Sequence, residues 1–249
     1  MPTSPAAQVP GPPDPVGPRH RRARVLLAAS AGLVALMGLL VEIDWWPLGR
    51  LDRAVTDGVT AWTADRPALV DATLVLTDAL GPWPLRSLLV VLAVVLAVRG
   101  HRRPAIWTLA VTALGSLTGA GLKLLVSRDR PVPADPLLDE TGFAWPSGHA
   151  STAALAAGVL VALATPSVRR WLVPLVVVAA ALVGASRVVL GVHWTSDVVS
   201  GWLLGVAVAL AASALAPPYG GRPGPERGAR PEPESGGRNP SPPRPADHR

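Results

Sequence analysis

The sequence predicts an all-α protein, a polytopic bundle of six transmembrane helices, and two observations support this class. Of its 249 residues, 49% are hydrophobic and only 16% are charged, whereas soluble domains carry about 25% charged residues. The apolar residues are also concentrated in six long blocks, and a helix that crosses the hydrocarbon core needs about 20 such residues. Because backbone polar groups must be satisfied within a segment in lipid, we expect each block to be a helix.

The two ends of the chain differ from the middle. Residues 1–24 and 217–249 are rich in proline, glycine and arginine, a composition that cannot bury a core and is typical of disorder. We therefore expect two disordered tails on either side of a membrane domain at residues 25–216. The chain has no cysteine, which excludes disulfides, thiolate metal sites and cysteine nucleophiles.

The six apolar blocks account for the membrane domain, since with their flanking residues all six are long enough to be spans. The third block continues past Lys123 to Val126. A cleaved signal peptide was considered for the first block, but the acidic residues after it make a poor cleavage region. The blocks lie at Val25–Val41, Ser87–Val98, Pro104–Leu122, Ala150–Val168, Trp171–Ser186 and Val198–Ala216.

The longest loop between spans, residues 47–82, has an amphipathic pattern. Leu51, Val55, Val59 and Trp62 recur at helical spacing, and aspartates fall mostly between the apolar positions. This pattern predicts one or two short amphipathic helices on the outer surface of the membrane. A seventh buried element is the weaker interpretation, because charges recur too often.

Charge distribution predicts the orientation. If the tails and the loops at 99–103 and 166–170 face the cytoplasm, that side holds 15 of the 23 basic residues and 5 of the 17 acidic ones. By the positive-inside rule, both termini are then cytoplasmic. We therefore attribute the net charge of +6 to the basic residues that set the membrane topology. Nucleic-acid binding is disfavoured because the tail arginines alternate with prolines and form no folded basic face.

Three motifs on the outer side carry ionisable residues that are unusual near a membrane. The first is KLLVSRDRP, residues 123–131, at the outer end of the third span. Lys123 is the only lysine beside 22 arginines, which suggests a need for a compact ammonium. Lys123 and Arg130 are two helical turns apart and are expected to share a face. Snorkelling anchors are the alternative explanation for both.

The second motif is PSGH, residues 146–149, immediately before the fourth span. Free amides at a helix N-terminus form an anion site, and Gly148 permits close approach of the backbone. Capping of the helix by Ser147 is the alternative, but a cap does not require His149.

The third motif is SRVVLGVHWTSD, residues 186–197, which joins the last two spans. His193 and Asp197 are at i and i+4, so they are expected to meet on one helical face. A carboxylate on one imidazole nitrogen leaves the other free as a base or nucleophile. A purely structural contact at a helix start is the alternative. Together, the three motifs predict a site for a phosphate-like anion with acid–base chemistry.

In these motifs the chain resembles the type 2 phosphatidic acid phosphatase (PAP2) superfamily, whose signature is K-x6-RP, PSGH and SR-x5-H-x3-D. The resemblance covers about residues 25–216 and implies a bacterial membrane lipid phosphatase with its site at the extracytoplasmic face. It implies that His193 attacks phosphorus, that Asp197 orients His193, and that His149 protonates the leaving group. The implied phosphate-binding groups belong to Lys123, Arg130, Ser147, Gly148 and Arg187.

No metal or other cofactor is expected, because three cations can take a metal's place in stabilising phosphate charge. The implied substrate is a lipid phosphate or diphosphate in the bilayer, such as phosphatidic acid, phosphatidylglycerol phosphate or an isoprenoid diphosphate; the oligomeric state is left open. Vanadium haloperoxidases share the signature but are soluble. A non-enzymatic lipid-binding or transport protein, or a structural membrane protein, would explain the spans without needing two histidines.

Overall fold

The computed structural model describes residues 18–132, 138 and 140–215; the expected C-terminal tail and most of the N-terminal one lie outside them. The described residues contain α-helices and no strand. The helices are α1 (Pro18–Glu42), α2 (Trp46–Thr63), α3 (Pro67–Ala79), α4 (Pro82–Val98), α5 (Arg102–Val126), α6 (Gly148–Leu163), α7 (Pro166–Val189) and α8 (Thr195–Leu215).

The all-helical membrane class is confirmed, although the count of six full spans is not. Five helical segments are long and apolar enough to cross a membrane: α1, the α3–α4 stretch, α5, α7 and α8. Helix α6 is apolar but has only 16 residues, or about 24 Å at 1.5 Å per residue. It ends at Leu163 rather than at Val168 as expected, because Pro166 opens the next helix and disfavours helical conformation in the residue before it.

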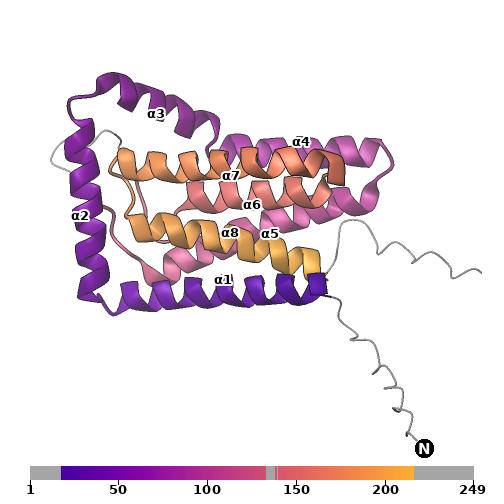
Figure 1. The fold of residues 1–249 in the computed structure, drawn as a ribbon, viewed down its shortest axis with the longest axis horizontal. Coiled ribbons are helices and arrows are strands. Elements are labelled where there is room, and N and C mark those ends of the chain that lie inside the picture. Colours follow the sequence, from indigo (N-terminus) through magenta and orange to yellow (C-terminus); the bar gives the residue numbers. More distant parts are fainter. Residues whose placement is uncertain (1–17, 133–137, 139, 216–249) are drawn as a thin grey trace, which may run out of the picture.

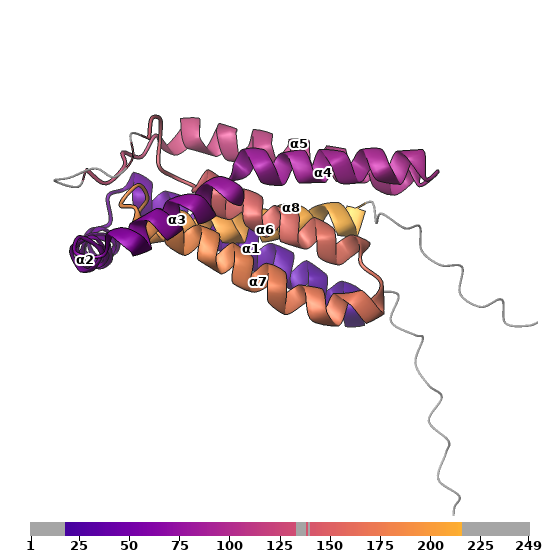
Figure 2. The ribbon, with the colours of Figure 1, turned by 90° about the horizontal axis from the view of Figure 1, so that it is seen from above.

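The long helices run alongside one another, and α2 crosses one end of them (Figure 1). In the view from above, α4 and α5 form a layer over the other long helices (Figure 2). Helix α6 packs against α4, α5, α7 and α8, while α8 also packs against α1. These two helices therefore form the centre of the bundle, and each begins in one of the three motifs.

Small residues bring α6 and α8 close together. A Cβ added to Gly201 would lie 2.6 Å from the carbonyl oxygen of Ser147, and one on Gly205 would lie 2.4 Å from that of Ser151. Glycines four residues apart on one face allow helix backbones to approach closely in a membrane. This packing places the first turn of α8 against the first turn of α6.

Two helices, α2 and α3, form where one or two short amphipathic helices were predicted within residues 47–82, although α3 also belongs to the apolar α3–α4 stretch. The side of α2 turned inward is polar, with Asp52, Thr56 and Thr63 buried, whereas Leu51 and Trp62 are exposed. The exposed side carries Leu51 and Trp62 together with Arg50, Arg53 and Asp57, a mixture that suits a helix in the membrane interface. The burial of Asp52 was not foreseen from the pattern.

The start of α1 and the end of α8 lie at the same end of the bundle, opposite α2 (Figure 1). Helix α1 begins at Pro18 rather than at Val25, inside the segment expected to be a disordered tail. The loops that carry the three motifs lie at the end crossed by α2, so the site and the described ends of the chain occupy opposite sides.

Candidate active site

The three motifs converge at the α2 end of the bundle, and backbone hydrogen bonds hold them together. The amide of Ala144 donates to the carbonyl of Arg128 at 2.8 Å, which ties the approach to α6 to the end of α5. The amide of Ser147 donates to the carbonyl of Asp197 at 3.0 Å, which ties the start of α6 to the start of α8. The expected meeting of the motifs is therefore present in the fold.

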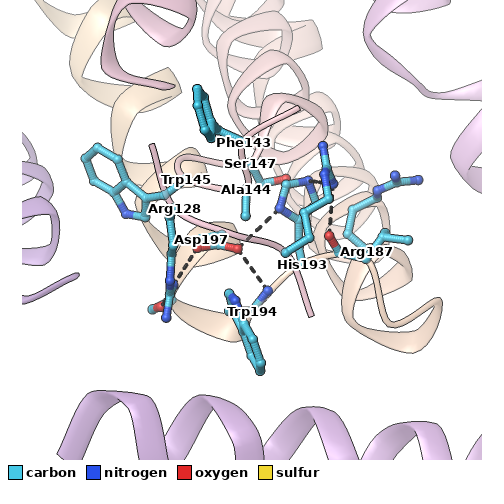
Figure 3. A network of polar contacts seen from close by, with 12 residues as sticks. Arg128, Phe143, Ala144, Trp145, Ser147, Arg187, His193, Trp194 and Asp197 are labelled. Carbon is cyan, nitrogen blue, oxygen red and sulfur yellow. Dashed lines mark hydrogen bonds and ion pairs between the residues drawn. The ribbon is translucent and has the colours of Figure 1, made fainter. Parts of the chain in front are cut away.

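His193 and Asp197 form a buried pair at the start of α8 (Figure 3). The distance from His193 Nδ1 to Asp197 Oδ2 is 3.3 Å, and the side chains are 2% and 0% exposed. The two do not share a helical face as expected, because His193 lies in the turn before α8. Asp197 reaches back as a cap instead, since its Oδ2 also accepts the amide of Trp194 at 2.9 Å.

The hydrogen bonds of His193 define its tautomer. Its Nε2 lies 3.2 Å from Nη1 of Arg130, and a guanidinium can only donate. Nε2 therefore accepts, and the ring proton is on Nδ1, facing Asp197. Burial lowers the pKa of His193 to about 4, although Asp197 opposes the shift. His193 is thus neutral near pH 7, with a lone pair on Nε2.

Arg130 and Arg187 lie on either side of a carboxylate that sequence reasoning missed, that of Glu140. Arg187 is 1% exposed and donates to Glu140 and, at 2.9 Å, to Thr77 Oγ1 of α3. Arg130 lies 3.4 Å from the other Glu140 oxygen. Burial alone would raise the pKa of Glu140, but the two guanidinium groups hold it below its usual value. A site for one anion is therefore occupied by the chain's own carboxylate.

Lys123 turns toward the segment before α6, where its ammonium donates to the carbonyl of Phe143 and lies 3.5 Å from that of Ala144. The expected common helix face of Lys123 and Arg130 is wrong. Helix α5 ends at Val126, and Ser127 adopts the left-handed conformation with a φ of 47°, which terminates helices.

Ser147, Gly148 and His149 occupy the start of α6. Ser147 is fully buried and caps the helix, its Oγ accepting from the amide of Ala150 at 3.5 Å. His149 is half-buried, and its Nε2 would lie 3.4 Å from a Cβ placed on Gly81. The imidazole therefore points toward the α3–α4 junction, and it has no hydrogen bond to the rest of the described chain.

Sequence reasoning also missed the group that binds the other carboxylate oxygen of Asp197, Oδ1. Arg128 donates to Asp197 Oδ1 at 2.6 Å and to Asp52 Oδ2 at 2.8 Å. Arg128 lies inside the first motif, so its charge was a visible signal, but Asp52 belongs to α2 and no spacing linked it to the site. Within the described residues, no group of three or more histidine, aspartate or glutamate side chains is arranged to hold a metal ion.

Comparison with known proteins shows which family these features resemble. Residues 104–219 match the PAP2 superfamily. An undecaprenyl-diphosphatase of Sulfolobus acidocaldarius is 45% identical over 65 residues, 26% of this chain and 30% of that protein. Phosphatidylglycerophosphatase B of Escherichia coli K12 is 42% identical over 77 residues, 31% of this chain and 30% of the relative. The match thus spans about a third of each curated relative.

A solved structure is similar over a longer range. The crystal structure of a transmembrane PAP2-type phosphatidylglycerolphosphate phosphatase from Bacillus subtilis has a TM-score of 0.63 and 25% identity, covering 76% of this chain and 96% of that one. Residues 104–219 of this chain, which contain all three motifs, therefore match the PAP2 superfamily, and the fold is similar to that of a transmembrane PAP2-type phosphatase.

Proposed function

We propose that this protein is an integral membrane phosphatase that hydrolyses a lipid phosphate or diphosphate through a phosphohistidine intermediate. The observation that carries the proposal is the state of His193. Its Nδ1 is held by Asp197, its Nε2 accepts from Arg130, and the ring is buried and neutral. A neutral imidazole whose unprotonated Nε2 lies beside cations is a nucleophile prepared for a phosphoryl group, once Arg130 moves its hydrogen bond from Nε2 to the phosphate.

In the proposed first step, the Nε2 lone pair of His193 forms a bond to phosphorus and the bond to the leaving oxygen breaks. His149, whose protonated form is stabilised by the bound phosphate anion, donates a proton to that oxygen. The Nδ1 proton stays between His193 and Asp197, and the carboxylate balances the positive charge that the ring acquires. In the second step water attacks phosphorus, the P–N bond breaks, and His149 accepts the proton released by the water.

The cations in the site supply the charge stabilisation that phosphoryl transfer requires. Arg130 and Arg187 already hold a carboxylate between them, which supports a role in binding the non-bridging oxygens. Lys123, Ser147 and the amide of Gly148 complete the proposed phosphate-binding set. Because the cations neutralise the developing charge, we expect activity to persist in a chelator, and no cofactor is required.

The membrane fold and the lipid phosphatases among the relatives support the proposed substrate class. The site lies at one end of a membrane bundle, so a phosphate carried on a lipid reaches it from the bilayer surface. Phosphatidic acid, phosphatidylglycerol phosphate and isoprenoid diphosphates share the required terminal phosphate. The distribution of arginines favours the extracytoplasmic face for the site and the cytoplasm for both termini. A non-enzymatic lipid-binding or transport protein is the alternative function.

The decisive experiment measures phosphate release from a panel of lipid phosphates by the protein purified in detergent. We expect His193→Ala to lose several orders of magnitude in rate, while His101→Ala, at an exposed histidine before α5, keeps the wild-type rate. Vanadate should inhibit, because it adopts the five-coordinate geometry of the transition state. If the wild-type protein binds lipid phosphates but releases no inorganic phosphate from them, the transport alternative would be favoured.

A further inference from the structure

We propose that Arg128 and Asp52 are positioning residues that hold the Asp197 carboxylate against His193. The catalytic effect of these residues rests on the proposed function, whereas their contacts with Asp197 do not depend on it. Arg128 lies on the side of Asp197 away from His193 (Figure 3). Neither residue contacts the cations proposed to bind phosphate in the described part of the chain.

The contacts of Arg128 are short and shielded from solvent. Its Nη1 lies 2.6 Å from Asp197 Oδ1, and its Nη2 lies 2.8 Å from Asp52 Oδ2. The side chains of Arg128, Asp197 and Asp52 are 15%, 0% and 2% exposed. A planar guanidinium with several fixed donors suits such a bridge between two carboxylates, and an ammonium does not.

Asp52 also anchors the start of α8. Its Oδ1 accepts the amide of Ser196 at 2.9 Å and its Oδ2 accepts the Ser196 hydroxyl at 2.5 Å, while that hydroxyl accepts from Arg128 at 2.7 Å. The amides in the first turn of a helix have no partner within the helix, and a carboxylate there is favoured by the helix dipole. Helix α2 is therefore tied to the turn that carries Asp197.

The balance of charges explains why the His193–Asp197 pair, the candidate dyad, needs these partners. His193 is neutral before the reaction, so it does not neutralise the buried Asp197, and a buried charge without a partner is strongly disfavoured. Arg128 supplies the opposite charge from the far side. Each Asp197 oxygen then has its own donors: Arg128 for Oδ1, and His193 with the Trp194 amide for Oδ2.

Asp52 limits the influence of Arg128. A guanidinium paired with Asp197 alone would weaken that carboxylate as an acceptor for His193, whereas one shared with Asp52 leaves Asp197 able to stabilise the cationic phosphohistidine. The bridge acts through Asp197 and does not touch the phosphate. Its loss should consequently lower kcat and leave KM and the vanadate inhibition constant nearly unchanged.

The test compares Arg128→Lys, Arg128→Ala and Asp52→Asn with Asp57→Asn, a control that removes an exposed carboxylate from the same helix. We expect kcat to fall by about 100-fold for Arg128→Ala, the cost of a misplacement near 1 Å, with partial rescue by Arg128→Lys and a smaller loss for Asp52→Asn. KM should stay within about twofold. Adding Asp52→Asn to Arg128→Ala should cause little further loss, because the shared bridge is already broken.

A second readout does not depend on turnover. Nitrogen NMR of labelled histidine, assigned with His193→Ala, should show the Nδ1-protonated tautomer in the wild type and a mixture of tautomers in Arg128→Ala and Asp52→Asn. If Arg128→Ala does not fold in detergent, the kcat and the His193 tautomer of Arg128→Lys and of the isosteric Asp52→Asn test the proposal instead.

Unchanged kcat and tautomer in folded variants would overturn the proposal, as would a rise in KM at constant kcat, which would make Arg128 a phosphate ligand. A wild-type protein that is inactive on every lipid phosphate, but whose tautomer responds to these variants, would refute the proposed function and leave the positioning role intact.

Discussion

Replacement of Glu140 by glutamine should improve substrate binding. The Glu140 carboxylate lies on Arg187 and Arg130, two of the cations proposed to bind phosphate, so a substrate must displace it. Glutamine keeps the size and an acceptor oxygen but removes the charge. The expected result is a lower KM for lipid phosphate with little change in kcat, because Glu140 has no contact with His193 or Asp197.

The magnitude follows from the exposure of the ion pairs. The Glu140 side chain is 30% exposed, and partly solvated ion pairs contribute about 0.2–1 kcal/mol each. Two pairs therefore give about 0.4–2 kcal/mol, which corresponds to a fall in KM of roughly 2- to 30-fold at 1.4 kcal/mol per factor of ten.

The assay is phosphate release from a short-chain lipid phosphate, with the inhibition constant of vanadate measured in parallel. Asp129→Asn is the matched control, since it removes an exposed carboxylate from the same segment between α5 and α6, without an ion pair in the described residues. A KM that is unchanged or higher in Glu140→Gln would refute the reasoning, because it would mean that Glu140 helps to place Arg187 for the substrate.

Three further predictions concern other parts of the molecule. Because the pKa of His193 is lowered to about 4, the acid limb of kcat/KM, where protonation removes the Nε2 lone pair, should lie below about pH 5, while loss of the proton that His149 donates sets a separate alkaline limb; an acid limb near pH 6.5 in the pH–rate profile would contradict this. Lys123→Arg should lower kcat/KM by about 100-fold, since a planar guanidinium does not fit the space in which the ammonium meets the Phe143 carbonyl; a ratio to wild type near one would make Lys123 an anchor. A reporter fused to the C-terminal tail should behave as cytoplasmic, and activity of that reporter only outside the cell would invert the topology.

The membrane class and the candidate dyad could be predicted from sequence because each depends on local information. Apolar blocks of near-span length indicate helices in lipid wherever they occur in a chain. The i, i+4 spacing of His193 and Asp197 ensures that they are close, even though the contact formed as a cap and not on a helical face. Boundaries were less certain: α5 ends at Val126 because Ser127 turns left-handed, which the motif did not reveal.

The groups around the dyad were decided by tertiary structure alone. Asp52 is 144 residues from Ser196, and Thr77 is 110 residues from Arg187, so no sequence spacing connects them. The pattern of α2 predicted an amphipathic helix on the membrane surface, yet Asp52 is buried, because Arg128 and the open amide of Ser196 offer it partners at the end of the bundle. Hydropathy and spacing report what a segment can do by itself, whereas the partners of a buried charge depend on which distant segments the packed helices bring beside it.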